Sequence, residues 1–196
     1  DIAGVDMVLE DASRPMKSHR GAVIEVNASP GLLAHIKPAA GDGRPLDFTS
    51  YGHNIEFAWL LSRAIKTLEL PPDTHREVIR RIADHTLQFG LDPEHGGVYI
   101  EGPFAGPATD TNKQFWQNAE TMVGLLDAYA VLGEAKYWTG FRQTHDFVFA
   151  KFVNLPAGGE WYAKLTRDGT PMWDYLGDAW KISYHTIRAT IETVQR

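Results

Sequence analysis

The sequence predicts a mainly α-helical protein preceded by a short β-hairpin segment. From residue 54 onward, apolar residues recur about every 3.6 positions, which is the spacing of one buried helix face. Stretches rich in glycine and proline separate these periodic segments, as turns between helices do. Before residue 47 the residue pattern is not helical, because two runs of β-branched residues flank a polar loop. Paired helices joined by turns therefore account for most of the chain.

The composition is that of a globular protein with room for a sizeable core: 196 residues, 43% hydrophobic and 22% charged. The net charge of -6 argues against nucleic acid as a partner, because there is no basic excess to neutralise phosphates. Apolar runs stay short of the roughly 20 residues that span a bilayer, so no membrane partner is expected. The sequence has no cysteine, which excludes disulfides and fits the cytoplasmic location that we expect. The first residue, Asp1, leaves open a fragment of a longer protein.

Two short runs near the start predict an antiparallel strand pair. Ile2–Leu9 and Gly21–Asn27 are rich in β-branched residues, and the polar segment Glu10–Arg20 joins them. The second run is followed by Ala28–Gly31, a turn sequence that contains proline and glycine.

Three oxygen-bearing residues on these strands are candidate metal ligands. Asp6 lies in the first strand, and Glu25 and Asn27 share one face of the second because side chains alternate along a strand. Such ligands suit Mg²⁺, which takes carboxylates together with substrate phosphates. A purely structural turn explains the same residues, so both interpretations stay open.

After a small linker, Ala39–Pro45, five amphipathic helices are expected. Breakers between them lie at Pro71–Asp73, Gly133–Glu134 and Asn154–Gly159. The positions expected to be buried are Ile55, Trp59, Leu60 and Ala64; Val78, Ile82, His85, Thr86 and Phe89; Met122, Leu125, Leu126 and Tyr129; Phe141, His145, Val148, Phe149 and Phe152; and Ile187, Ala189, Ile191 and Val194.

Two loops interrupt the helices, at Asp92–Tyr99 and Gly159–Gly169. Each combines a glycine turn with a short aromatic run, and the second predicts a hairpin closed at Arg167–Gly169. Such loops between helices are where a helical protein carries its binding residues.

The stretch Tyr51–Leu61 places a histidine and a carboxylate one helical turn apart. Gly52 disfavours a helix interior, so we expect the helix to begin near His53 or Asn54, with His53 and Glu56 on one face. An imidazole held by a carboxylate can act as an acid or a base. Alternatively, Asn54 caps the helix and His53 is a structural, half-buried histidine.

Two further clusters, Phe115–Glu120 and Trp180–Arg188, combine aromatic rings with polar groups. Sugar-binding sites use this combination, because the C–H faces of a sugar stack on aromatic rings while its hydroxyls form hydrogen bonds with polar groups. The other tryptophans are expected to serve packing, and a zinc site fails because His53 and His185 have no third ligand at a suitable spacing. The candidate sugar-binding residues are Phe115, Trp116, Glu120, Trp180 and Arg188.

The N-terminal 46 residues resemble the end of an ATP-grasp ligase domain of the cyanophycin synthetase type. The resemblance rests on Gly4–Val8, Ile24–Leu32 and His35–Pro38. It implies that Asp6, Glu25 and Asn27 match positions that bind the Mg²⁺ holding ATP. Because the rest of such a ligase is not in this sequence, Mg²⁺ and ATP are expected only if this remnant is functional, and binding should be weak.

Residues 47–196 resemble the N-acylglucosamine 2-epimerase family, which includes cellobiose 2-epimerases and aldose–ketose isomerases. The stretch Tyr51–Leu61, the motifs WQNAETMVG and GEWY, and Trp180–Arg188 carry the resemblance. It implies the C-terminal half of an (α/α)6 barrel, so the expected domains are 1–46 and 47–196. The residues matching the family's site are the catalytic His53 and His185, with Glu56 orienting the first, and Trp116, Glu120 and Arg188 at the sugar.

The resemblance further implies proton transfer at carbon 2 of a reducing mono- or disaccharide, through an enediolate and without a cofactor. Phe115 and Ser183 depart from the cellobiose epimerase pattern, which argues against a disaccharide. Two alternatives remain: a fragment of an ATP-grasp ligase, and a carbohydrate-binding half-barrel without catalysis. Half a barrel should expose an apolar edge, so a homodimer, aggregation or marginal stability is expected.

Overall fold

The computed structural model describes residues 4–9, 21–27, 49–71, 73, 75–173, 175–177, 181 and 183–195. The chain divides into two compact units, one made of residues 1–47 with 60–75 and the other of residues 48–59 with 76–196. The second unit contains the helical pairs and the candidate site. Helices of the described residues are too short or too polar to cross a membrane.

Strands β1 (Gly4–Leu9) and β2 (Gly21–Asn27) pair antiparallel, which confirms the predicted strand pair. The register places Asp6 opposite Glu25 and Gly4 opposite Asn27, with an irregularity after Asp6. The side chains of these strands lie outside the described structure, so the Mg²⁺ site at Asp6, Glu25 and Asn27 stays a prediction.

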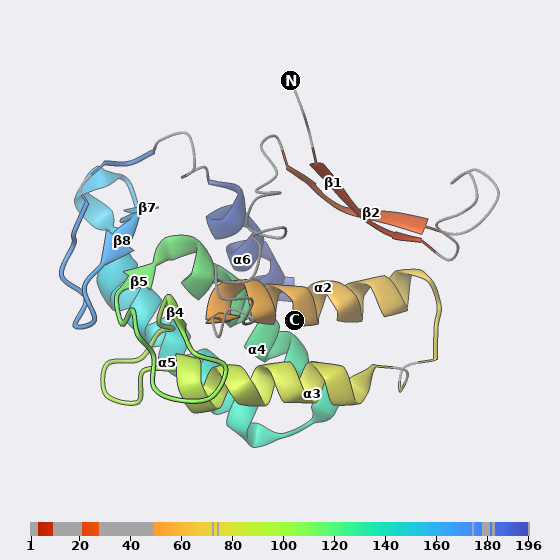
Figure 1. Cartoon of the computed structure of the whole chain (residues 1–196). Helices are drawn as coiled ribbons and strands as arrows, with labels where there is room; N and C mark the ends of the chain where they lie inside the picture. The colour runs from red at the N-terminus through yellow and green to blue at the C-terminus, as the bar shows by residue number, and fades with distance from the viewer. Residues whose placement is uncertain are drawn as a thin grey trace, which may run out of the picture. The chain divides into compact units, whose positions relative to one another are not determined.

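The second unit is built around α4 (Phe115–Leu132), which packs against α3, α5 and α6. Most of α4 is buried on every side, and Gly133 ends it in a left-handed conformation. Figure 1 shows α4 passing behind α3. The remaining helices are α2 (Tyr51–Thr67), α3 (Arg76–His85), α5 (Ala135–Phe147) and α6 (Tyr184–Gln195), with π-helical ends η2 (Thr86–Gly90) and η3 (Val148–Phe152).

Helix α2 begins at Tyr51, two or three residues earlier than predicted, and Gly52 lies inside its first turn. The reason is a close approach between helices. A Cβ on Gly52 would lie 2.4 Å from Cγ of Gln117, and a Cβ on Gly124 would lie 2.5 Å from Cγ1 of Ile55. Glycine therefore allows the start of α2 to contact α4 directly, and this requirement outweighs its low helix propensity.

The predicted buried faces of α2 and α4 are largely confirmed, whereas those of α3 and α6 are partly wrong. In α3 the buried residues are Ile79 and Ala83, and Val78 is 41% exposed. In α6 the buried residues are Thr186 and Ala189, which face α4, while three predicted core residues are exposed. The predicted core positions that are exposed are Val78, Tyr129, Phe149, Ile187, Ile191 and Val194.

Short strand pairs hold the ends of the helices. They are β3 (Thr49–Ser50) with β4 (Glu101–Gly102), β5 (Lys113–Gln114) with β8 (Lys164–Leu165), and β6 (Val153–Asn154) with β7 (Glu160–Trp161), and η4 (Leu155–Ala157) joins the last two strands. The predicted turn at Arg167–Gly169 is confirmed, but its limbs are Leu165 and Pro171, because β7 pairs with β6 instead.

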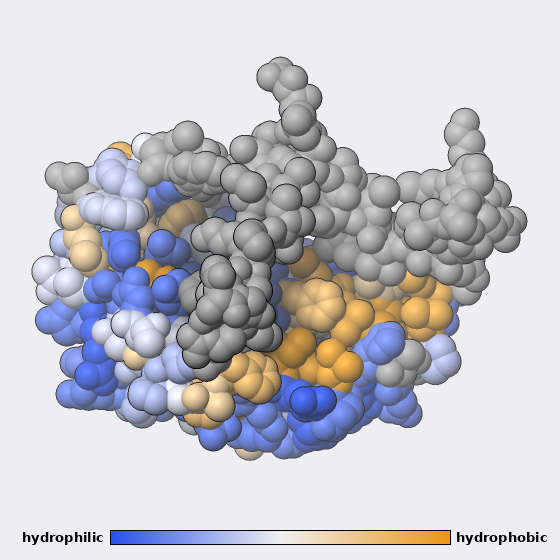
Figure 2. Space-filling model, viewed as in Figure 1, coloured by the Kyte–Doolittle hydropathy of each residue, from blue (hydrophilic) through white to orange (hydrophobic). Residues whose placement is uncertain are grey.

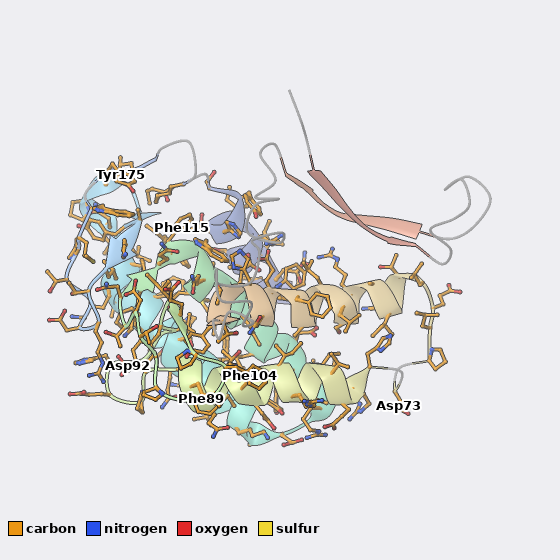
Figure 3. All side chains as sticks on the ribbon, viewed as in Figure 1. Asp73, Phe89, Asp92, Phe104, Phe115 and Tyr175 are labelled. Carbon is orange, nitrogen blue, oxygen red and sulfur yellow. The ribbon has the colours of Figure 1, made fainter. Side chains whose placement is uncertain are left out.

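A buried ion-pair cluster fixes the loop after η2. Lys113 and Asp92 are fully buried, and Nζ of Lys113 donates to Oδ2 of Asp92 at 3.0 Å. Arg167 donates to both oxygens of Asp92, which ties the turn after β8 to the same carboxylate. Burial alone would raise the pKa of Asp92, but these hydrogen bonds hold it well below its usual range. Figure 3 labels Asp92, which follows η2 in the chain.

Candidate active site

The indole of Trp116 contacts both predicted catalytic histidines. Its ring centroid lies 4.6 Å from that of His53 and 5.6 Å from that of His185. His53 comes from the first turn of α2, Trp116 from the first turn of α4, and His185 from the first turn of α6. Three helix starts therefore meet at one aromatic ring, and residues 132 positions apart (185 minus 53) share one site.

A buried carboxylate, Glu120, organises the deep side of this site. Its Oε1 atom lies 2.6 Å from Nδ1 of His185, and its Oε2 atom accepts a hydrogen bond of 2.9 Å from Nε1 of Trp59. Trp59 is 1% exposed and Glu120 is fully buried. Glu120, expected to bind sugar, is thus the residue that orients His185 in this structure.

Arg188 bridges two carboxylates. Its Nη2 atom donates to Oε1 of Glu56 at 2.8 Å and to Oε1 of Glu120 at 2.5 Å. Burial alone would raise the pKa of Glu120, but the hydrogen bond from His185 and the charge of Arg188 outweigh it and leave that pKa lowered. Burial opposes the charge of Arg188 as well, yet Glu120 keeps the pKa of the guanidinium above its usual value. The guanidinium of Arg188 and the carboxylates of Glu56 and Glu120 therefore form a charged cluster beside His185.

His53 is held by a hydroxyl group. Its Nδ1 atom lies 2.8 Å from Oγ of Ser50, the last residue of β3. Glu56, one turn further along α2, makes its ion pair with Arg188 at 2.8 Å. The orienting bond expected from Glu56 to His53 stays a prediction.

Phe115, at the start of α4, packs beside the imidazole of His185, and Figure 3 labels it. Its ring is 6.1 Å from that of His185 in an edge-on contact, and the side chain is 5% exposed. Lys181 lies over this ring at 5.3 Å and donates to Oε1 of Glu160 at 2.7 Å. The hydrogen bond from Lys181 to Glu160 therefore connects the segment just before α6 to the GEWY motif. Trp180 lies outside the described residues, so its role stays a prediction.

One group in the described part of the chain has metal-ligand geometry: Glu56, Glu120 and His185 offer atoms within 4.8 Å of one another. The Nη2 atom of Arg188 already contacts both carboxylates, so a cationic group lies where a metal ion would. We therefore assign no metal to this group.

Four residues that contact the site were not named as site residues from the sequence: Ser50, Trp59, Gln114 and Tyr184. Gln114 accepts a hydrogen bond of 2.9 Å from Nε1 of Trp116, and the ring of Tyr184 is 3.9 Å from that of His185. Ser50, Gln114 and Tyr184 each contact a ring one to three residues further along the chain, whereas Trp59 contacts Glu120, which is 61 residues away. Local spacing does not reveal such contacts.

The paired helices, with histidines from two of them around one tryptophan, define a partial α/α barrel with its site at the helix starts. The chain belongs to the N-acylglucosamine 2-epimerase family, whose model matches residues 39–189. This finding confirms the family expected from the motifs.

The relatives are sugar epimerases. Cellobiose 2-epimerase from Ruminococcus albus is 30% identical over 154 residues, which cover 76% of this chain and 38% of the relative. Human N-acylglucosamine 2-epimerase is 28% identical over 142 residues, which cover 70% of this chain and 33% of the relative. The chain therefore spans less than two fifths of the length of these relatives.

Solved structures agree on the fold. The cellobiose 2-epimerase of Bacillus thermoamylovorans superposes with a TM-score of 0.70 at 26% identity, covering 84% of this chain and 45% of that chain. A family 76 α-mannanase from Bacteroides thetaiotaomicron, at 18% identity and a TM-score of 0.56, covers 74% of this chain and 38% of that one. The predicted partial (α/α)6 barrel is thus confirmed.

A second, short similarity matches the other resemblance. Cyanophycin synthetase from Synechocystis is 46% identical over 41 residues, which is 21% of this chain and 5% of that protein. The similarity is confirmed, and it extends over too little of the synthetase to carry its activity to this chain.

Proposed function

We propose that the chain carries the proton-transfer site of a sugar 2-epimerase or aldose–ketose isomerase. The observation that carries the proposal is the contact of His53 and His185 with the single ring of Trp116. Two imidazoles at one aromatic ring allow a sugar stacked there to be approached by two acid/base groups.

In the proposed mechanism a reducing sugar opens, and one imidazole removes the proton from carbon 2. Nδ1 of each histidine is engaged, by Ser50 in one case and by Glu120 in the other, so proton transfer falls to the Nε2 atoms. The electron pair left on carbon 2 shifts toward the carbonyl oxygen and gives an enediolate. Return of a proton by the other imidazole to the opposite face of carbon 2 gives the epimer. Return of a proton to carbon 1, with the hydroxyl proton of the carbon 2 oxygen passing to the carbon 1 oxygen, gives the ketose.

The surroundings of His185 support this role. The buried carboxylate of Glu120 fixes the ring orientation and stabilises positive charge that forms on the imidazole during transfer. Glu120 in turn is fixed by Trp59 and Arg188. The proton chemistry requires neither a redox cofactor nor a metal ion.

The substrate class follows from the rings and from the relatives. Trp116 and Phe115 suit the apolar face of a sugar, and the relatives are epimerases of cellobiose and of N-acylglucosamine. A solved relative at 23% identity is described as a D-mannose isomerase, which makes mannose a third candidate. We expect a reducing mono- or disaccharide.

A second candidate is a carbohydrate-binding module without turnover, because the rings of Trp116 and Phe115 would also suit a site that only binds a sugar. The chain covers 36% of a cellobiose 2-epimerase from Eubacterium cellulosolvens. A complete enzyme needs donors for the enediolate, and the loss of one such donor typically lowers the rate about 10² to 10³-fold.

Deuterium exchange at carbon 2 tests the proposal. N-acetylmannosamine, mannose and cellobiose are incubated with the chain in heavy water, and both epimers are followed by NMR. His53→Ala and His185→Ala should each stop interconversion, and each should keep exchange in only one epimer, because one base remains.

His145→Ala is the matched control, since this histidine lies on α5 with a side chain 38% exposed. Exchange unaffected by either variant would refute the two-histidine mechanism. Saturable binding of a sugar without any exchange would establish the binding module instead.

A further inference from the structure

Two residues at strand ends hold the rings at the centre of the site. Ser50 ends β3 and Gln114 ends β5, and the next residue of the chain begins α2 and α4 respectively. Ser50 contacts Nδ1 of His53 at 2.8 Å, and Oε1 of Gln114 accepts from Nε1 of Trp116 at 2.9 Å. In both helices, the side chain just before the helix holds a ring in the first turn.

The two strand ends are themselves fixed by pairing. Ser50 pairs with Glu101 of β4, and Gln114 pairs with Lys164 of β8. Gln114 has an extended backbone and its side chain does not cap α4, so its amide is used for Trp116 instead. A rotation of either ring therefore has to break a hydrogen bond to a residue held by the backbone of a second strand.

We infer that Ser50 and Gln114 are positioning residues for the proton-transfer site, Ser50 for the imidazole of His53 and Gln114 for the indole of Trp116. The inference rests on the proposed function. Because the two rings lie 4.6 Å apart, a tilt of one displaces the other, and the two hydrogen bonds together fix the pair.

The two residues have different kinetic consequences. Ser50 determines which nitrogen of His53 is engaged, and a ring that rotates or changes tautomer spends less time in the reactive geometry, so Ser50→Ala should lower kcat about 10 to 10²-fold with little change in KM. Gln114 orients the surface on which the sugar stacks, so Gln114→Leu should mainly raise KM. Ser50→Thr keeps the hydroxyl, so its kcat should stay close to that of the parent chain. Gln114→Glu keeps an acceptor, so its KM should stay close to that of the parent chain.

The test combines these kinetics with NMR of the full chain, labelled with ¹⁵N. Ser50→Ala should shift the ring nitrogen signals of His53 and leave those of His185 unchanged. Gln114→Leu should shift the indole N–H signal of Trp116, which Trp116→Phe identifies, and speed its exchange with solvent. Thr139→Val is the control, because it removes a hydroxyl bonded within α5.

Unchanged ring signals of His53 in Ser50→Ala, or of the Trp116 indole in Gln114→Leu, would overturn the inference for that residue. Equal shifts in Thr139→Val would also overturn it, because they would show a general effect on the fold. If the parent chain turns over no sugar, the proposed function fails, and the NMR signals still decide the positioning roles.

Discussion

The Nδ1 atom of His185 lies 2.6 Å from Oε1 of Glu120, although 65 positions separate the two residues. This contact joins the first turn of α6 to the buried core of α4. It is also the point at which the proposed proton transfer and the stability of the fold depend on the same atoms, because Arg188 shares the Oε1 atom of Glu120.

Glu120→Gln should therefore lower both activity and stability. The amide retains the shape but loses the charge that stabilises a protonated His185, so exchange at carbon 2 should fall about 10² to 10⁴-fold. Arg188 loses one of its two carboxylates in a buried setting, which should cost on the order of 3 kcal/mol in the free energy of unfolding. Exchange rates and urea unfolding measure the two effects. Unchanged exchange in a folded variant would show that Glu120 does not support the base.

Lys113→Met should destabilise the fold by about 3 to 5 kcal/mol at pH 7, because Asp92 then stays buried with Arg167 as its remaining cation among the contacts described above. The pKa of Asp92 is lowered in the folded chain, so its ionised form contributes stability above the ordinary value of 3.8 and loses it as pH falls below that value. The difference in the free energy of unfolding between the parent chain and Lys113→Met should therefore become smaller at acidic pH. Urea unfolding at pH 7 and pH 3 checks this.

Lys136→Met is the matched control for that measurement. Lys136 contacts Asp84 and Glu134, but its side chain is 43% exposed. Surface ion pairs contribute about 0 to 1 kcal/mol, so the control should leave stability nearly unchanged. A loss as large as that of Lys113→Met would contradict the role assigned to burial.

Gly124→Ala should push the first turns of α2 away from the middle of α4. The added Cβ would lie 2.5 Å from Cγ1 and 2.9 Å from the carbonyl oxygen of Ile55, and the backbone contact leaves little room to adjust. Overpacking of this kind costs about 1 to 3 kcal/mol. The shift should also weaken the contact of His53 with Trp116, so tryptophan fluorescence and exchange should change together. Gly133→Asn is the control, because that site is open and left-handed.

The sequence predicted the helical pairs, the strand pair and most of the site, because periodicity and motif spacing are local properties. It predicted that His53, Trp116, Glu120 and His185 share one site, and the structure brings these four side chains together. It did not predict that Glu120 bonds His185, since that contact depends on how α4 packs against α6. Gly52 misled the prediction of the helix start for the same reason, because only the contact with Gln117 explains its position.

The sequence pattern also failed to predict that one apolar face of α6 is exposed. Ile187, Ile191 and Val194 recur at helical spacing and were predicted to be buried, yet they are 55%, 48% and 83% exposed. Figure 2 shows apolar surface gathered over α2 as well, and Phe57 of that helix is 54% exposed. Periodicity identifies an apolar face but cannot say whether the element that covers it belongs to the same stretch of chain.

The last prediction concerns this face. Apolar side chains exposed together on one helix face favour association, so the chain should self-associate at micromolar concentration. Ile187→Glu combined with Ile191→Glu should give a monomer in sedimentation velocity, whereas Leu155→Glu, at a residue 78% exposed on η4, should not. If a second copy completes the site, exchange per chain should rise with concentration in the parent and stay flat in the double variant. Exchange independent of concentration in an associating parent would show that association and activity are separate properties, and that the groups acting on the sugar all come from one chain.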